Sequence, residues 1–437
     1  MNNVKDFGAK GDGISKDTEA IQQAIDAGGM VLFPPGTYLS GTLYLKSNGG
    51  LFLEPGAVLL ASPDLTDYNS DDAFSQNNVC SQERVTGAHF ILAVEQENIV
   101  ITGGGRIDGN RQAFYGTPEP PTAEASEEKF SDERFLSGKR PGQMIVFCEC
   151  NHIQIRDVEL FNAPYWTCFI HGCTDVQVRG LHILNDQRTR NGDGIDIDCC
   201  QRVTVSDCVI DSGDDCITLR GNDRRLKVKR PCEYITVSNC VLHTNCNAIR
   251  IGVGSGTIRN AVFSNIVVHD SVNGICIVSN YSENPAAGAL IENIQFENIR
   301  LDCQRPFLIL SCVCGPAAFP PAKEIRNIFF RSITGTCSAP PLVCGSQGQG
   351  VHDISFSSIH FFYRGQARKL SEDMNRRYGE WNESDPACAF YLAHVQKVSF
   401  SDTTFRMAET PVPWKCGLAE VNTGNIISRD SFFEQQS

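Results

Sequence analysis

Short runs of alternating apolar and polar residues return along most of the chain. Each run places β-branched or aromatic residues two positions apart, the period-two pattern of a half-buried β-strand. Nine such runs begin at Ile99, Ile153, Val176, Val203, Ile235, Ile294, Ile328, Ile354 and Val398. Turn residues separate the runs and leave no room for long helices. The sequence therefore predicts an all-β protein built from many short strands.

The intervals between neighbouring runs predict a solenoid. The runs at Ile153, Val176, Val203 and Ile235 follow one another at 23, 27 and 32 residues. A coil of this length has room for two or three short strands, which is typical of a parallel β-helix. Equivalent residues of successive coils then stack at about 4.8 Å. We expect one parallel β-helix domain over residues 1–437.

Three segments depart from the strand pattern. Residues 112–142 are rich in proline and acidic residues, and residues 364–388 are charged and lack alternation. Both are predicted to be loop insertions, either plain surface loops or covers for a substrate. Residues 18–27 have helical spacing with Asp17 as a candidate N-cap. A short helix there would cap the open edge of the first coil.

The composition is that of a soluble chain with an unusual number of cysteines. Of 437 residues, 41% are hydrophobic and 20% are charged, and 20 are cysteines. No C-x-x-C spacing indicates zinc, and no basic-then-apolar segment at the start indicates export. We expect the cysteines to be reduced thiols buried in a stacked core, with Cys208 and Cys240 at equivalent places of their coils, in a cytoplasmic protein.

The net charge limits the partners. A formal charge of −13 without a long basic run argues against nucleic acid and anionic membranes. No run of about 20 apolar residues predicts a membrane span. The sequence gives no indication of the oligomeric state.

Three aspartates carry the predicted chemistry. Asp193 lies in the segment Asn191-Gly192-Asp193-Gly194, and Asp214 follows it after 21 residues, next to Asp215. This separation is close to one coil, so the three carboxylates are expected to share one small surface. Crowded carboxylates repel one another, which raises the pKa of at least one and suits it to general acid catalysis beside an ionised base.

Two other interpretations of these aspartates stay open. Asp and Gly at coil corners satisfy backbone groups in any β-solenoid through Asx turns. Clustered carboxylates are also hard oxygen ligands and can hold calcium. The coil-matched spacing favours catalysis over both, and we expect no metal ion and no cofactor.

The motifs resemble those of glycoside hydrolase family 28, the polygalacturonase family. The similarity covers about residues 3 to 300 and is carried by residues 4–13, 33–38, 101–109, 162–166, 191–194 and 213–216. It implies a right-handed parallel β-helix that hydrolyses a glycosidic bond with inversion. Asp214 would be the general acid, and Asp193 with Asp215 would position and deprotonate the water. Asn191 would be a polar group at the site.

Departures from the family's motifs concern substrate binding. Asn247 stands where the family has a histidine, and Cys276 and Val278 stand where it has an arginine and a lysine that hold the galacturonate carboxylate. Charge-assisted hydrogen bonds to a carboxylate are lost with those cations. The sequence therefore leaves open whether a galacturonate carboxylate is still bound.

Compensating groups are available nearby in sequence. We expect Asn247, Arg250, Arg220 and Trp166 to bind substrate together with Asn191. Arginines beside the aspartates can instead form ion pairs that neutralise them, and Trp166 can equally belong to the core.

The prediction is a cytoplasmic glycoside hydrolase that acts on a pectin-related or similar oligosaccharide, its only expected partner. Exo-action follows from a cytoplasmic location, which polymers do not reach. Two alternatives stay open. A β-helix polysaccharide lyase would need a base that abstracts a proton next to a carboxylate, and a catalytically silent carbohydrate-binding protein would bind without turnover.

Overall fold

The computed structural model describes residues 1–77, 79–115, 139–281, 288–313, 323–346, 350–364, 388–408, 414 and 416–435. Both predicted insertions, 112–142 and 364–388, lie almost entirely outside the described residues. The described residues group into two compact units. Unit 1 comprises Met1–Ile217, Arg224–Lys229 and Thr244–Cys246, and unit 2 comprises Thr218–Asp223, Arg230–His243 and Asn247–Ser437. A single domain over the whole chain stays a prediction.

Short strands dominate the first half of the chain. The helical elements there are η1 (Val4–Phe7), α1 (Thr18–Asp26), η2 (Leu65–Asp67), η3 (Ser81–Glu83) and η4 (Arg111–Ala113). The strands are β1 (Asn2–Asn3), β2 (Asp12–Lys16), β3 (Met30–Phe33), β4 (Gly36–Ser40), β5 (Leu43–Tyr44), β6 (Gly49–Leu53), β7 (Ala57–Ala61), β8 (Ile91–Val94), β9 (Glu97–Thr102), β10 (Arg106–Asp108), β11 (Ile145–Cys148), β12 (Asn151–Arg156), β13 (Glu159–Phe161), β14 (Cys168–His171), β15 (Thr174–Arg179), β16 (His182–Leu184), β17 (Ile195–Asp198), β18 (Gln201–Ser206) and β19 (Val209–Ser212).

The second half contains longer strands and one short 3-10 helix, η5 (Asp223–Arg225). Its strands are β20 (Ile217–Gly221), β21 (Cys232–Ser238), β22 (Val241–Thr244), β23 (Asn247–Gly254), β24 (Thr257–Asn280), β25 (Leu290–Cys312), β26 (Ile325–Cys337), β27 (Leu342–Cys344), β28 (Val351–Tyr363), β29 (Cys388–Ala393), β30 (Val395–Met407), β31 (Cys416–Val421), β32 (Ile427–Arg429) and β33 (Phe432–Phe433).

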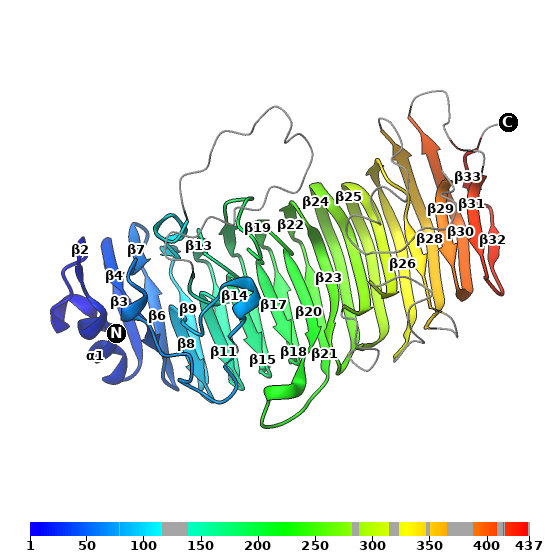
Figure 1. Cartoon of the computed structure of the whole chain (residues 1–437). Helices are drawn as coiled ribbons and strands as arrows, with labels where there is room; N and C mark the ends of the chain where they lie inside the picture. Colours follow the sequence, from blue (N-terminus) through cyan, green and yellow to red (C-terminus); the bar gives the residue numbers. More distant parts are fainter. Residues whose placement is uncertain are drawn as a thin grey trace. The chain divides into compact units, whose positions relative to one another are not determined.

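Parallel pairing stacks the strands of unit 1 in three columns (Figure 1). The first column contains β3, β6, β9, β12, β15 and β18. The second contains β4, β7, β10, β13, β16 and β19. The third contains β5, β8, β11, β14 and β17. The chain visits each column once per coil, so unit 1 is a right-handed parallel β-helix, as predicted.

Aliphatic ladders form the core of unit 1. Ile153 pairs with Ile99 on one side and Val176 on the other, and Val176 pairs with Val203. The four side chains are at most 2% exposed. The alternation therefore marks the inward face of each coil.

Several strands of unit 2 are longer than those of unit 1. One strand continues through the bends at which unit 1 begins a new strand. β24 pairs in turn with β21, β22 and β23 along its length. It bends at Asn260, Asn265 and Asp270, which have φ angles of 54°, 55° and 50°. Asn and Asp tolerate this left-handed conformation better than most residues.

A stack of five phenylalanines fills the core of unit 2. Neighbouring rings are nearly parallel, with centroids 5.0, 5.0, 4.8 and 5.2 Å apart, in the order Phe263, Phe296, Phe330, Phe356 and Phe400. These spacings match the distance between paired strands. Phe433 packs edge-on against Phe400 at 5.2 Å and closes the stack towards the C-terminus.

Helix α1 lies where the sequence predicts a capping helix, and Asp17 is its N-cap residue, as predicted. Ile21, Ala24 and Ile25 are buried on its inner face. Asp17 occupies the N-cap position, yet its side chain makes no capping hydrogen bond to the helix. Its carboxylate instead accepts from the N–H groups of Lys10 and Gly11, at 2.7 and 2.9 Å. The Asp17 carboxylate thus accepts from N–H groups of the preceding loop instead of those of the helix.

The cysteines lie inside the coils, as predicted. Of the described cysteines, 17 are buried, and none of the described ones is part of a disulfide bond. Cys150, Cys173 and Cys200 form a ladder in which the Cys150 N–H donates to the Cys173 sulfur and the Cys173 N–H to the Cys200 sulfur, both at 3.3 Å. Burial raises the pKa of the Cys173 thiol, so it stays protonated.

Cys208 and Cys240 make the same local contact. Their thiols donate to the carbonyls of Ser206 and Ser238, at 3.2 and 3.3 Å. The cytoplasmic location stays a prediction from the cysteine content. Among the described residues, no helix is both long and apolar enough to cross a membrane.

Candidate functional site

Two neighbouring coil corners in unit 1 bring the three predicted catalytic aspartates together. The Gly194 N–H donates to the Asp215 carbonyl at 2.8 Å, and the Asp214 N–H donates to the Gly192 carbonyl at 3.4 Å. Asp193 therefore lies one coil step from the Asp214–Asp215 pair. Asp193 is 4% exposed, whereas Asp214 and Asp215 are partly exposed. The predicted register thus brings the backbone segments of the three aspartates onto neighbouring coils.

Glycines allow this close approach of the two corners. A Cβ atom at Gly194 would lie 2.5 Å from the Cys216 carbonyl oxygen, and one at Gly213 would lie 2.4 Å from the Thr189 carbonyl oxygen. Both neighbours are backbone atoms and cannot rotate away. The glycines of these motifs are thus required by packing around the aspartates.

Replacing Gly194 should separate the two corners. We expect Gly194→Ala to lower the free energy of unfolding by about 1–3 kcal/mol, because the added methyl group overpacks a backbone contact. Chemical denaturation checks this, with Gly221→Ala as the matched control, since a Cβ there meets its nearest atom at an ordinary 3.4 Å. Equal stability of the two variants would contradict the steric argument.

Asp214 is fixed through its backbone and has a thiol beside its carboxylate. Its carbonyl accepts hydrogen bonds from the hydroxyls of Ser212, at 2.8 Å, and Thr244. Thr244 also accepts from the Cys246 N–H at 3.0 Å. The carboxylates of Asp214 and Asp215 and the Cys246 sulfur lie within 4.8 Å of one another. Calcium takes oxygen ligands, so the thiol disfavours the calcium alternative and would suit a softer cation.

A buried arginine positions Asn191. Asn191 has a left-handed φ of 50°, and its side-chain oxygen accepts from Arg140 at 3.3 Å. Arg140 is fully buried, also donates to the Arg190 carbonyl, and stacks on the Tyr165 ring at 4.7 Å. The fork of one guanidinium thus fixes the segment just before Asp193.

Trp166 belongs to a row of aromatic side chains on strand β14 and on the residues just before it. We define the aromatic strip as Tyr165, Trp166, Phe169 and His171. Trp166 stacks on Tyr165 at 5.1 Å and meets the edge of Phe169 at 5.3 Å, and Phe169 stacks on His171 at 5.2 Å. Trp166 is partly exposed. It is therefore available at the surface rather than confined to the core.

The strip lies one coil from Asp193 and two coils from the Asp214–Asp215 pair. Cys168 pairs with Ile195, so counting back two residues sets Trp166 opposite Asp193. At the other end of the strand, the His171 ring is 4.0 Å from the carboxylate of Asp198. This contact ties His171 to the neighbouring coil.

Arg188 forms an ion pair with Asp186, an acid outside the three predicted catalytic aspartates. Its guanidinium binds Asp186 with nitrogen–oxygen distances of 2.9 and 2.5 Å, and Arg111 lies 3.4 Å from the same carboxylate. Burial opposes ionisation of Asp186, but these cations outweigh it and lower its pKa. The carboxylate that these two arginines neutralise is therefore that of Asp186.

Unit 2 contains the other predicted binding residues. The Asn247 side chain is buried and accepts from the Asn273 amide at 2.8 Å. Arg250 is 3% exposed, lies over the Tyr281 ring at 4.5 Å and donates to the Cys276 sulfur at 3.4 Å. Arg220, at the end of β20, is partly exposed.

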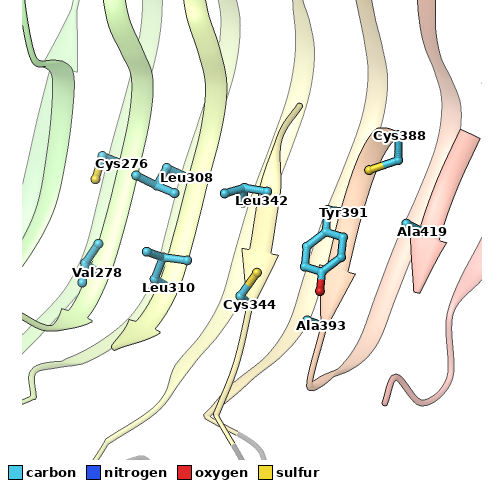
Figure 2. Close-up of a cluster of buried hydrophobic side chains, with 10 residues drawn as sticks. All are labelled: Cys276, Val278, Leu308, Leu310, Leu342, Cys344, Cys388, Tyr391, Ala393 and Ala419. Carbon is cyan, nitrogen blue, oxygen red and sulfur yellow. The ribbon is translucent and has the colours of Figure 1, made fainter. Parts of the chain in front are cut away.

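Cys276 and Val278 belong to an apolar cluster. Both are fully buried, and Figure 2 shows them beside Leu308 and Leu310 of the next strand, which pair with them in register. The two positions that depart from the family's cationic motif are therefore packed among apolar side chains, and the Arg250 guanidinium also contacts the Cys276 sulfur.

Several residues at the site have no recognisable signal in the sequence. Arg140 stands at the edge of a predicted insertion, and Thr244 and Cys246 come from a later coil. Only the fold brings them to Asn191 and Asp214. A count of one coil beyond Asp215 would have indicated the neighbourhood of Cys246.

Two family profiles match the chain. A profile described as Glycosyl hydrolases family 28 matches residues 72–376, and one described as Rhamnogalacturonase A/epimerase, pectate lyase-like matches residues 1–103.

Individual relatives are distant. A probable polygalacturonase of Vitis vinifera is 28% identical over 62% of this chain and 55% of its own length. An exo-poly-alpha-D-galacturonosidase of Dickeya chrysanthemi is 27% identical over 82% of this chain and 66% of its own length. The chain thus spans 55–66% of the length of these two curated relatives.

A solved structure supports the fold. The family 28 exopolygalacturonase of Yersinia enterocolitica has a TM-score of 0.70 and 20% identity, covering 97% of this chain and 77% of that one. At this identity the likeness establishes the β-helix fold alone.

Proposed function

The chain belongs to glycosyl hydrolases family 28, and on that premise we propose that it is an exo-acting glycoside hydrolase of pectin-related oligosaccharides. The observation that carries the proposal is the position of Asp193 one coil step from Asp214 and Asp215. Relatives described as polygalacturonase and exo-poly-alpha-D-galacturonosidase support the substrate class and the exo-action.

The proposed reaction uses the three aspartates in two roles. Asp214 gives its proton to the leaving glycosidic oxygen as the bond to the anomeric carbon breaks. Asp193 and Asp215 hold a water molecule on the opposite face of the sugar and take up its proton as the new carbon–oxygen bond forms. The product has the inverted configuration. Asn191 contacts the bound sugar, and the partly exposed Trp166 is its platform.

The binding residues of unit 2 narrow the substrate. Asn247, Arg250 and Arg220 are proposed to contact sugar hydroxyls or carboxylates. Cys276 and Val278 offer no charge to a carboxylate. We therefore expect weaker activity on plain galacturonan than on an oligosaccharide whose sugars are partly neutral.

A substrate panel tests the function. Oligogalacturonides, partly esterified oligogalacturonides and neutral pectic oligosaccharides are incubated with the protein, and new reducing ends and product lengths are measured. Release of short products from one chain end supports exo-hydrolysis. An unsaturated product that depends on a divalent cation would instead indicate a lyase, and tight binding without turnover would indicate a silent carbohydrate-binding protein.

Arg140 should act on catalysis as a positioning residue. Arg140→Lys keeps the charge but loses the planar fork that holds Asn191 and the Arg190 carbonyl. We expect kcat/KM to fall about tenfold, since misplaced substrate-contacting groups raise the barrier. Arg106→Lys, in a partly exposed ion pair with Glu159, is the control and should change kcat/KM little. Unchanged kinetics in Arg140→Lys would contradict the positioning role.

A further inference from the structure

Four cations gather in one short loop of an otherwise acidic chain. We define the basic loop as Arg224–Lys229, with the sequence RRLKVK. The chain has a net charge of −13, so a concentration of positive charge stands out electrostatically. The loop belongs to unit 1, the unit that contains the three aspartates.

The middle of the basic loop is anchored at several points. The Lys227 and Val228 N–H groups donate to the carboxylate of Glu149 at 3.3 and 3.0 Å. The Lys227 ammonium pairs with Glu95 and lowers the pKa of that carboxyl. Arg225 donates to the Asn77 carbonyl. A loop held by this many bonds loses little further entropy when a ligand binds.

The anchor depends on one column of turn residues at the ends of β8, β11 and β14. Glu95, Glu149 and Gly172 have left-handed φ angles of 55°, 51° and 66°. The two glutamates bind the loop with their side chains. At Gly172 a Cβ would lie 2.6 Å from Leu226, so the missing side chain is the space into which Leu226 packs.

Two cations of the basic loop are left for a ligand. Arg224 and Lys229 are exposed, and within the described part of the chain neither has an acidic side chain in ion-pair range. Exposed arginines elsewhere on the coils bind acids, as in the pairs Arg202–Asp175, Arg259–Glu233 and Arg326–Glu292. Two cations within five residues of each other on an anchored loop match an anionic ligand.

The aromatic strip connects the basic loop to the aspartates. Gly172, against which Leu226 packs, directly follows β14, and Trp166 at the start of the strip lies opposite Asp193. Six residues of extended chain between Trp166 and Gly172 span at most about 20 Å. The acids between them, Asp196 and Asp198 of β17, are 0% and 2% exposed. They present little charge to a ligand on the strip.

We propose that Arg224 and Lys229 bind the carboxylate of an acidic sugar several units from the bond that is cleaved, with the oligosaccharide passing over Trp166 and Phe169, the partly exposed members of the aromatic strip. This inference rests on the proposed function. It adds that charge recognition occurs at a distant sugar through the basic loop, while the position of Cys276 and Val278 is apolar. Long acidic substrates should then bind better than short ones.

Binding measurements on an inactive background test this without turnover. In Asp214→Asn, a galacturonide dimer, a hexamer and the methyl-esterified hexamer are titrated by calorimetry with and without Arg224→Gln and Lys229→Gln. We expect the double substitution to weaken binding of the acidic hexamer about tenfold or more, since charge-assisted hydrogen bonds to a carboxylate are lost. Binding of the dimer and of the esterified hexamer should stay within about twofold.

A charge-matched control separates recognition from general electrostatics. Lys10→Gln with Arg331→Gln removes the same charge from exposed positions outside the loop and should leave hexamer binding unchanged. An equal loss in this control, an equal loss for the esterified hexamer, or no loss in the loop variant would overturn the proposal, as would a parent that binds no acidic hexamer. Failure of the proposed function appears separately, as absent hydrolysis by the parent whose binding is intact.

Discussion

Asp214→Asn should lower kcat by about 10²–10⁴-fold on every substrate that the parent hydrolyses, because the amide cannot give a proton to the leaving oxygen. KM should change little, since the amide keeps the shape and most of the polarity of the carboxyl group. Steady-state kinetics on the best substrate of the panel measures both constants. Substrates with an activated leaving group, which need no protonation, should recover much of the lost rate.

Asp207→Asn is the matched control for this substitution. Asp207 lies seven residues earlier, at a turn with a φ of 58°, a conformation that asparagine also adopts readily. The control should keep its activity and stability. If Asp214→Asn retained the kcat of the parent, or if both variants lost activity equally, Asp214 would not be the general acid.

Phe330→Ala should lower the free energy of unfolding by about 3–5 kcal/mol, the usual range for a buried phenylalanine. Phe330 is the middle ring of the phenylalanine stack, with neighbours at 5.0 Å on one side and 4.8 Å on the other. It also contacts Phe307 at 4.9 Å. Removing it leaves a cavity that the paired strands on either side cannot close, because the backbone hydrogen bonds fix their spacing. Denaturant unfolding followed by circular dichroism checks the value.

The preceding residue offers the control for the stack. Phe329 is on the same strand, points outward and is 48% exposed, so Phe329→Ala should change the stability by no more than about 0.5 kcal/mol. Similar losses for both variants would show that strand propensity, rather than the inward stack, stabilises this coil.

The alternation of side chains was enough to predict the fold, because one face of every coil must be apolar. The nine runs miss some of the coils, including those of β3 and β6. The interval of 59 residues between Ile235 and Ile294 holds a further coil, in which Ala261 pairs with both of them. Alanine fills the inward position but carries little strand propensity, so the sequence does not mark it.

Contacts outside the repeat were harder to predict. The Asp17 carboxylate can accept from N–H groups of the helix or from those of Lys10 and Gly11. The sequence alone does not show which of these N–H groups lie closer. In the same way the left-handed turn residues were predictable as Asn, Asp and Gly, whereas Glu95 and Glu149 adopt that conformation without any sequence preference for it.

The catalytic part of the site followed from spacing, and its surroundings did not. A separation of 21 residues matched the coil closely enough to bring Asp193 to Asp214. Arg140 and the basic loop are placed by segments whose course no repeat dictates. Leu226 packs at Gly172, although the two residues are 54 positions apart in sequence. The need for glycine at position 172 is visible only once the position of β14 is known.

The configuration of the first product is the most direct test of the three-aspartate site. A carboxyl pair one coil step apart is closer than the roughly 6.5–9.5 Å usual for inversion and nearer the roughly 5–5.5 Å usual for retention, so the outcome separates the two mechanisms. Proton NMR of the sugar released from an α-linked galacturonide, recorded before mutarotation, should show the β-anomer first. An initial α-anomer would contradict the account, because it would require one aspartate to form a covalent intermediate instead of activating water.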